Sequence, residues 1–82
     1  MYSHFVYHSE QSVAMVDLES IGRKIAKVRA EQGMSQEDLA GEAELARNYI
    51  SRIENGHVAF SVSVLLRIAS ALGIKPEVLL KD

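Results

Sequence analysis

The sequence predicts a small all-α protein built from five short helices. Three observations carry this prediction: apolar residues recur at three- and four-residue steps, residues that cap helices precede these stretches, and glycines follow most of them. We find no run of alternating apolar and polar residues of the kind that predicts a strand, and no internal repeat. Because the chain has 82 residues, it forms one domain at most and can bury only a small core.

The first helix is expected to start at Asp17, whose side chain can cap it, and to stop at Gly33. Its apolar stripe is formed by Leu18, Ile21, Ile25 and Val28. Residues 1–16 hold three of the five aromatic residues and follow neither a helical nor a strand period. We therefore divide the chain into an N-terminal arm over residues 1–16, disordered or docked on a partner, and a folded domain over residues 17–82. Met15 offers an alternative start of the chain.

A capping box predicts the second helix, over residues 35–43. Ser35 and Asp38 are three residues apart, so each side chain can accept a bond from the other's backbone N–H. A short turn over residues 44–46 leads to a third helix over residues 47–55, which Gly56 ends. Two short helices joined by a turn of three or four residues form a helix-turn-helix.

Two further helices are predicted in the last third of the chain. The fourth begins near Ser61 and stops at Gly73, and Pro76 favours a short fifth helix over residues 75–80. The core face of the fourth helix carries Leu65, Ile68, Ala69 and Leu72. Three other apolar residues lie off that face: Val62, Val64 and Leu66. Since a small domain without disulfides gains stability from association, we expect these three residues to form a dimer interface.

The charges are unevenly distributed, although the net charge of −2 argues weakly against nucleic-acid binding. A basic run without any acid inside it consists of Arg23, Lys24, Lys27 and Arg29, and two further arginines are Arg47 and Arg52. The acids cluster elsewhere, at Glu37, Asp38, Glu42 and Glu44. A local basic face on an acidic protein is compatible with this distribution.

The third helix has the composition that a DNA-reading helix needs. In a helix-turn-helix, the second helix of the motif enters the major groove and meets base edges through side chains near its N-terminus. Ile50 and Ile53 are three residues apart and are expected to face the core. The outward residues are then Arg47, Asn48, Ser51 and Arg52. Arginine can bind guanine through two hydrogen bonds and asparagine can bind adenine, so this surface predicts sequence-specific binding of double-stranded DNA.

From Gly22 to Leu80 the sequence resembles the XRE family, the helix-turn-helix type of the phage Cro and CI repressors. The matching segments are Ile21-Gly22-Arg23-Lys24-Ile25, Gly33-Met34-Ser35-Gln36-Glu37-Asp38-Leu39-Ala40, Asn48-Tyr49-Ile50-Ser51-Arg52-Ile53-Glu54-Asn55-Gly56, and Leu65-Leu66-Arg67-Ile68-Ala69-Ser70-Ala71-Leu72-Gly73. The resemblance implies a compact five-helix, lambda-repressor-like domain. It also implies a transcriptional repressor that binds a pseudo-palindromic operator as a homodimer.

Residue roles follow from this resemblance where the sequence matches the family pattern. The DNA-binding residues it implies are Gln36, Arg47, Asn48, Tyr49, Ser51, Arg52 and Asn55. Gln36 is the expected phosphate contact, because a helix N-terminus favours an anion there. Arg29 and Glu54 match a structural pair that ties the first helix to the third.

The sequence departs from the family at three places. Glu44 stands where the turn usually has glycine, and Ala46 stands where the reading helix usually has a serine or threonine cap. The loop over residues 57–60 lacks the usual basic residues and proline. We therefore expect fewer phosphate contacts from this loop, a modest affinity, and a greater dependence on Arg47, Arg52 and the basic run over residues 23–29.

Other classes of function find little support in the sequence. A protein-interaction module of the same fold, such as an antitoxin or a partner of another regulator, remains the alternative, with residues 2–7 as its working surface. A gel shift, or a neighbouring toxin or restriction–modification gene, would discriminate between the two. His4 and His8 are four residues apart, but no helix or carboxylate completes a metal site there. We predict no metal, no cofactor and no enzymatic activity.

The cellular setting is predicted from two further absences in the sequence. The chain has no cysteine, which excludes disulfides and thiolate zinc sites and fits the reducing cytoplasm. No stretch approaches 18 apolar residues, so no membrane span is expected. The expected partners are double-stranded DNA and a second copy of the chain.

Overall fold

The structure is a computed structural model that describes residues 17–81, and within this range it contains five helices and no strand. They are α2 (Leu18–Glu31), α3 (Gln36–Ala43), α4 (Arg47–Glu54), α5 (Val62–Leu72) and α6 (Pro76–Leu80). The all-α prediction is confirmed, and the predicted ends fall on or next to the observed capping residues. Among these residues, no helix is long and apolar enough to cross a lipid bilayer. The predicted N-terminal arm lies outside the described residues.

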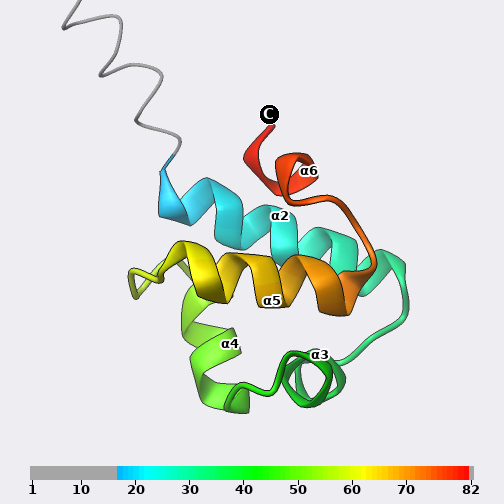
Figure 1. The fold of residues 1–82 in the computed structure, drawn as a ribbon. Coiled ribbons are helices and arrows are strands. Elements are labelled where there is room, and N and C mark those ends of the chain that lie inside the picture. The colour runs from blue at the N-terminus through cyan, green and yellow to red at the C-terminus, as the bar shows by residue number, and fades with distance from the viewer. Residues whose placement is uncertain (1–16, 82) are drawn as a thin grey trace, which may run out of the picture.

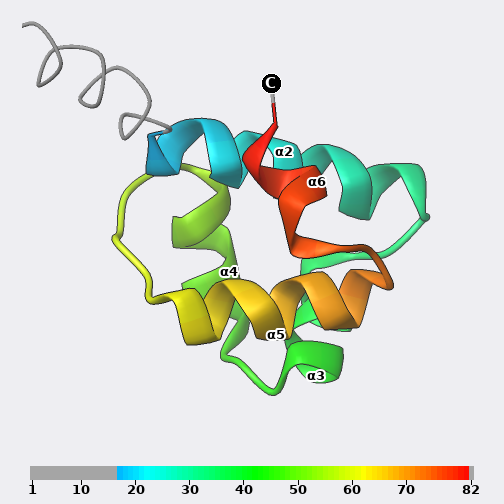
Figure 2. The same ribbon diagram turned by 45° about the horizontal axis from the view of Figure 1, so that its top comes forward.

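The helices are arranged around one core. Figures 1 and 2 show α2 and α5 running in the same general direction. In Figure 1, α3 and α4 lie on one side of this pair and α6 lies on the other. Helix α4 packs against α2 and α3, α3 also packs against α5, and α6 contacts both α2 and α5. The helix-turn-helix formed by α3 and α4 is therefore held from two directions, by α2 and by α5.

Side-chain caps explain where three of the helices begin. The carboxylate of Asp17 accepts a bond from the Ser20 backbone N–H at 2.6 Å. In the predicted capping box, Ser35 Oγ accepts from the Asp38 N–H at 2.9 Å and Asp38 Oδ2 accepts from the Ser35 N–H at 3.0 Å. These bonds hold the pKa of the Asp38 carboxyl below its ordinary value. Ser61 caps α5 in the same way, through the Val64 N–H.

Every described helix contributes a fully buried side chain to the core. These residues are Ile25, Leu39, Ile50, Ile53, Ile68 and Leu79. Burying a side chain of this size stabilises a fold by about 1.5–3 kcal/mol. The burial of Ile50 and Ile53 confirms the predicted core face of α4. The loop after Gly56 also packs on the core, through half-buried Val58 and Phe60, which accounts for its apolar composition.

Helices α2 and α4 approach each other closely enough for their backbones to meet. At Gly22 a Cβ atom would lie 2.1 Å from the carbonyl oxygen of Ile53, so only glycine fits. Gly22 thereby sets the distance between α2 and the helix that carries the predicted DNA-reading residues.

Candidate nucleic-acid interface

Helix α4 presents a polar surface on the side opposite to its buried isoleucines. Arg47, Asn48 and Arg52 are exposed, and Ser51 between them is half-buried. No side chain accepts a hydrogen bond from the first turn of this helix, because its N-cap is Ala46. Since uncapped backbone N–H groups at a helix N-terminus favour anions, this end of α4 suits a phosphate as well as a base edge.

A buried carboxylate connects three elements of the domain. Glu54 Oε2 accepts a bond from Arg29 Nε at 2.7 Å, and Glu54 Oε1 accepts one from Arg29 Nη2 at 3.0 Å. The Glu54 side chain is 4% exposed and that of Arg29 is 17% exposed. Arg29 also donates from Nη1 to the Met34 carbonyl at 2.8 Å, which fixes the segment before α3. The hydrogen bonds to Glu54 raise the pKa of Arg29. Because its guanidinium is bonded to Glu54 and to the Met34 carbonyl, Arg29 does not belong to an exposed basic surface.

The same carboxylate orients the residue that the sequence suggested as a phosphate contact. Gln36 Nε2 donates to Glu54 Oε1 at 2.9 Å, and the Gln36 side chain is half-buried at the start of α3. A carboxamide nitrogen has two N–H groups, so one donor remains after this bond is made. Sequence reasoning missed the bond between Gln36 and Glu54, because it depends on how α3 crosses α4.

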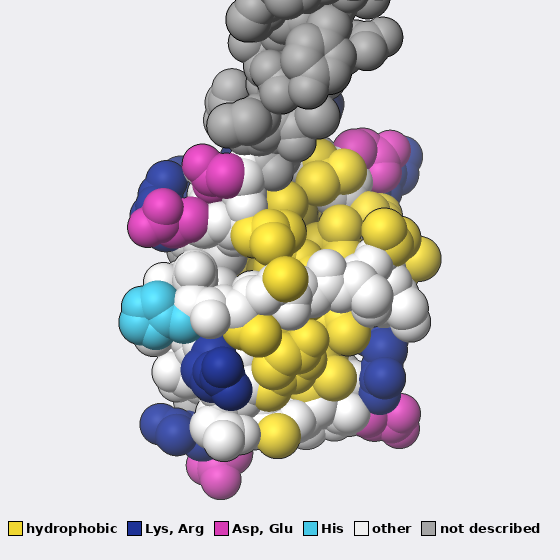
Figure 3. All heavy atoms as spheres, turned by 90° about the vertical axis from the view of Figure 1, so that its left-hand side faces the viewer, with side chains coloured by type: hydrophobic (Ala, Val, Ile, Leu, Met, Phe, Trp, Pro, Cys, Tyr) yellow, Lys and Arg dark blue, Asp and Glu magenta, His cyan; other side chains and the backbone are white. Residues whose placement is uncertain are grey.

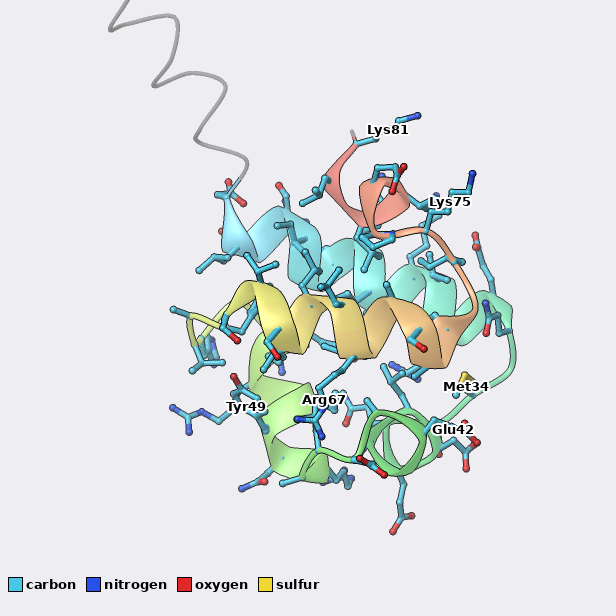
Figure 4. The ribbon with its side chains drawn as sticks, viewed as in Figure 1. Met34, Glu42, Tyr49, Arg67, Lys75 and Lys81 are labelled. Carbon is cyan, nitrogen blue, oxygen red and sulfur yellow. The ribbon has the colours of Figure 1, made fainter. Side chains whose placement is uncertain are left out.

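Tyr49 and Asn55 occupy different surroundings on α4. Tyr49 is half-buried and packs against the core, and Figure 4 shows it on the stretch of α4 beneath α5. Asn55 is exposed, and its Nδ2 donates to the Ser51 carbonyl at 2.9 Å. The Ser51 carbonyl also accepts from the Asn55 backbone N–H at 3.0 Å, and Asn55 Nδ2 lies 3.5 Å from Ser51 Oγ, so the side-chain amide nitrogen of Asn55 is held against Ser51.

The predicted basic run divides between two environments. Arg29 belongs to the buried ion pair, whereas Arg23, Lys24 and Lys27 line a hollow between α2 and α6. Arg23 lies 3.7 Å from Glu19, and Lys24 donates to the Lys81 carbonyl. The run is therefore not one continuous basic surface.

An apolar face lies over the start of α2, the start of α5 and α6. Val62 is 71% exposed and Leu66 is 48% exposed, whereas Val64 is half-buried and packs against the core. Three further exposed apolar residues are Leu18, Val78 and Leu80. A groove on this face is lined by Leu18, Ile21, Phe60, Ser61, Val62, Leu65, Leu66, Pro76 and Leu80. Figure 3 shows apolar side chains gathered there. The sequence suggested only the α5 part of this face.

The described residues contain no group of three histidine, aspartate or glutamate side chains placed to hold a metal ion. His4 and His8 lie outside the described range. Within that range, every buried side-chain nitrogen and oxygen has a hydrogen-bond partner, so no unsatisfied polar group marks a ligand site.

The sequence profile of the helix-turn-helix family matches residues 25–79, which span all of α3, α4 and α5. The chain belongs to this family. Among relatives of the helix-turn-helix protein, control protein C.BamHI of Bacillus amyloliquefaciens is 43% identical over 60 residues, which cover 72% of this chain and 74% of C.BamHI.

Solved structures resemble the helix-turn-helix protein over most of its length. The restriction–modification controller protein C.AhdI from Aeromonas hydrophila has a TM-score of 0.74 and 35% identity, with 76% of this chain and 94% of that chain covered. The controller C.Esp1396I bound to a 25-base-pair operator has a TM-score of 0.70 and 37% identity, with 76% and 82% covered. C.Esp1396I is also known as a tetramer on its natural 35-base-pair operator. The helix-turn-helix protein is a DNA-binding transcription regulator, which confirms the class predicted from its sequence.

Proposed function

We propose that this regulator is a controller of the restriction–modification type, which binds a pseudo-palindromic operator as a homodimer and represses transcription by occupying it. The observation that carries the proposal is the polar surface of α4, where Arg47, Asn48 and Arg52 are exposed opposite two fully buried isoleucines. The likeness to C.BamHI, C.AhdI and C.Esp1396I supports the controller class. Repression requires only that the bound protein cover DNA near a promoter, which suits a small domain.

Each residue of the interface has a proposed role that its surroundings support. Arg47, Asn48 and Arg52 read base edges, because they are exposed on the helix expected to enter the major groove. The small side chain of Ser51 lets the helix approach the bases. Three other residues contact the DNA backbone: Gln36, Tyr49 and Asn55. The Gln36 amide is well prepared for this role, since Glu54 holds it in place.

Association into a dimer supplies the length of DNA contact that one domain lacks. A single reading helix covers only a few base pairs, whereas two helices related by a two-fold axis lie about 34 Å apart and enter successive major grooves. The exposed apolar face around Val62 and Leu66 supports a symmetric contact of this kind. Leu18 and Leu80, which line the groove on this face, extend it.

We also infer that the protein acts by occupancy and without catalysis, as the regulators in its family suggest. The cytoplasm is the compartment we propose, since a DNA target lies there in a bacterial cell and the sequence contains no cysteine. Residues 1–16 are proposed to be an arm separate from the domain over residues 17–82.

A gel shift with the DNA that flanks its own gene tests the proposed function. We expect a complex that survives an excess of random duplex at fixed salt, because base contacts add to the salt-dependent attraction to phosphates. Equal competition by random and flanking DNA would favour the protein-interaction module instead.

Arg47→Ala should lower the affinity for the operator by about 1–3 kcal/mol and relax the preference at the base pair that Arg47 reads. Gln36→Ala should weaken binding to all sequences alike, since a phosphate contact carries no sequence information. Affinities for the operator and for its single-base-pair variants, measured by fluorescence anisotropy, distinguish the two roles. An Arg47→Ala protein with an unchanged preference would refute the assignment.

Leu66→Glu should produce a folded monomer that binds the full operator about 100-fold more weakly or worse. A monomer on one half-site no longer holds a second subunit close to the other half-site. The fold should survive, since Leu66 is 48% exposed. Sedimentation equilibrium at micromolar concentration measures the association. Ala30→Glu is the matched control, because Ala30 is exposed on a helix, α2, and lies outside the apolar groove. A wild-type protein that stays monomeric, free and on DNA, would contradict the dimer.

A further inference from the structure

The turn between α3 and α4 contains an unusual backbone conformation. Glu44 has φ 59° and ψ 45°, which is the left-handed region. Within residues 17–81, the other three residues with positive φ are glycines, namely Gly33, Gly56 and Gly73. A side chain disfavours this region, so something in the fold must hold Glu44 in it.

A side chain from α5 reaches this turn. Arg67 Nη2 donates a hydrogen bond to the Glu44 carbonyl oxygen at 2.9 Å, across 23 residues of sequence. Figure 4 shows Arg67 extending from α5 into the space between α3 and α4. The guanidinium also lies 3.7 Å from the Glu44 carboxylate, but that carboxylate is 84% exposed, so the ion pair contributes little.

The bond to the carbonyl has a more direct consequence than the ion pair. It fixes the peptide plane between Glu44 and Leu45, and this plane determines the direction in which the chain leaves α3. The carbonyl also lies at the C-terminal end of α3, where the helix dipole favours a cation, and the last turn of α3 has no basic residue of its own.

The start of α4 is also held by half-buried Leu45, which packs against the core, and by the Glu44 N–H, which donates to the Gly41 carbonyl at 3.3 Å. The N-cap of α4, Ala46, makes no side-chain hydrogen bond, and the Leu45 N–H donates to the Ala40 carbonyl at 2.9 Å. The turn that leads into the reading helix therefore contains one residue in a disfavoured conformation, Glu44, and Arg67 supports its carbonyl from outside the helix-turn-helix.

We propose that Arg67 is a positioning residue for operator binding, which holds Glu44 in its left-handed conformation and so fixes the orientation of α4 relative to α3. The inference rests on the proposed function for its DNA readout. It also predicts a property of the free protein. The Leu45 N–H, which donates to the Ala40 carbonyl, is protected from hydrogen exchange because Arg67 holds the turn.

Arg67→Met tests the proposal, since methionine keeps an unbranched apolar stem and removes the guanidinium. We expect operator affinity to fall about 10-fold at a temperature where the variant is fully folded, which corresponds to about 1.4 kcal/mol and to the cost of a left-handed residue. Affinity for random DNA should change less, and exchange of the Leu45 amide should become faster. A loss confined to the melting temperature, with unchanged affinity and exchange, would reduce Arg67 to a structural role and overturn the proposal.

A second substitution at Glu44 separates backbone support from charge. Glycine adopts the left-handed region without penalty, so Glu44→Gly should restore the affinity and the Leu45 protection of Arg67→Met. Glu44→Gln removes the same negative charge but keeps a side chain, so it should not restore either property. Equal rescue by both substitutions would show that only charge matters and would contradict the proposal.

Different outcomes would contradict operator binding and the positioning role of Arg67. If wild-type protein shows no preference for any operator, the proposed function is wrong, and the Leu45 exchange rates still decide whether Arg67 holds the turn. If wild-type protein binds its operator and Arg67→Met binds equally well with unchanged exchange, the positioning role is wrong and the proposed function stands.

Discussion

Replacing Gly22 by alanine should destabilise the domain by about 3 kcal/mol or more, at the upper end of what overpacking costs. The new Cβ would lie 2.1 Å from the Ile53 carbonyl oxygen and 3.3 Å from the Glu54 carbonyl carbon. Both are backbone atoms, so no change of rotamer relieves the overlap and α2 must move away from α4. A domain of this size has a free energy of unfolding of only about 3–10 kcal/mol, so the substitution removes a large share of its stability and should lower its urea midpoint markedly.

Gly41→Ala is the matched control for this prediction. Gly41 is also a helical glycine, on the exposed side of α3, and no atom lies within 4 Å of the position that its Cβ would occupy. Alanine there should stabilise the domain by about 0.5–1 kcal/mol, because it forms helix more readily than glycine. Urea unfolding followed by circular dichroism measures both variants, and equal midpoints would contradict the close approach of α2 and α4.

Glu54→Ala should cost about 3 kcal/mol, toward the lower end of what breaking a buried ion pair costs, because Arg29 is 17% exposed and can be partly solvated. The loss also leaves the Gln36 amide without its partner. Operator affinity should fall as well, since the Gln36 side chain is then no longer held in the orientation proposed for its phosphate contact. Glu54→Gln retains an acceptor and should be less destabilised than Glu54→Ala.

Glu42→Ala provides the comparison, because Glu42 is an exposed carboxylate of α3. Its removal should change stability by less than about 0.5 kcal/mol, as is usual at the surface. Thermal unfolding at a fixed pH compares the two variants. Identical melting temperatures for Glu54→Ala and Glu42→Ala would show that the ion pair does not stabilise the fold.

Features that depend on local sequence were predicted correctly. Asp17, Ser35 and Ser61 cap helices through bonds that span three residues, so their role can be identified without knowing the tertiary structure. The same holds for the spacing of Ile50 and Ile53, since a helical period alone assigns them to one face. The pair of Arg29 and Glu54 was suggested by the family resemblance, not by spacing.

Features that depend on how the helices are placed were not predicted. The bond from Gln36 to Glu54 needs the crossing of α3 over α4, and the bond from Arg67 to Glu44 needs the position of α5 beside the turn. The predicted apolar face was incomplete for the same reason, because it included only residues of α5. Leu80 joins this face only because α6 folds back against α2 and α5. The position of α6 on the other helices cannot be predicted from its hydrophobic period or its composition.

Selection of binding sites from a random duplex library, at one fixed salt concentration, tests the central claim most directly, because it requires no knowledge of the natural operator. Wild-type protein should enrich a pseudo-palindrome whose half-sites are centred about 10 base pairs apart, or a multiple of that distance, as expected for two α4 helices in successive major grooves. Arg47→Ala should enrich a motif that is degenerate at one position in each half-site. A wild-type pool with no motif above the input library would contradict the claim that α4 reads an operator.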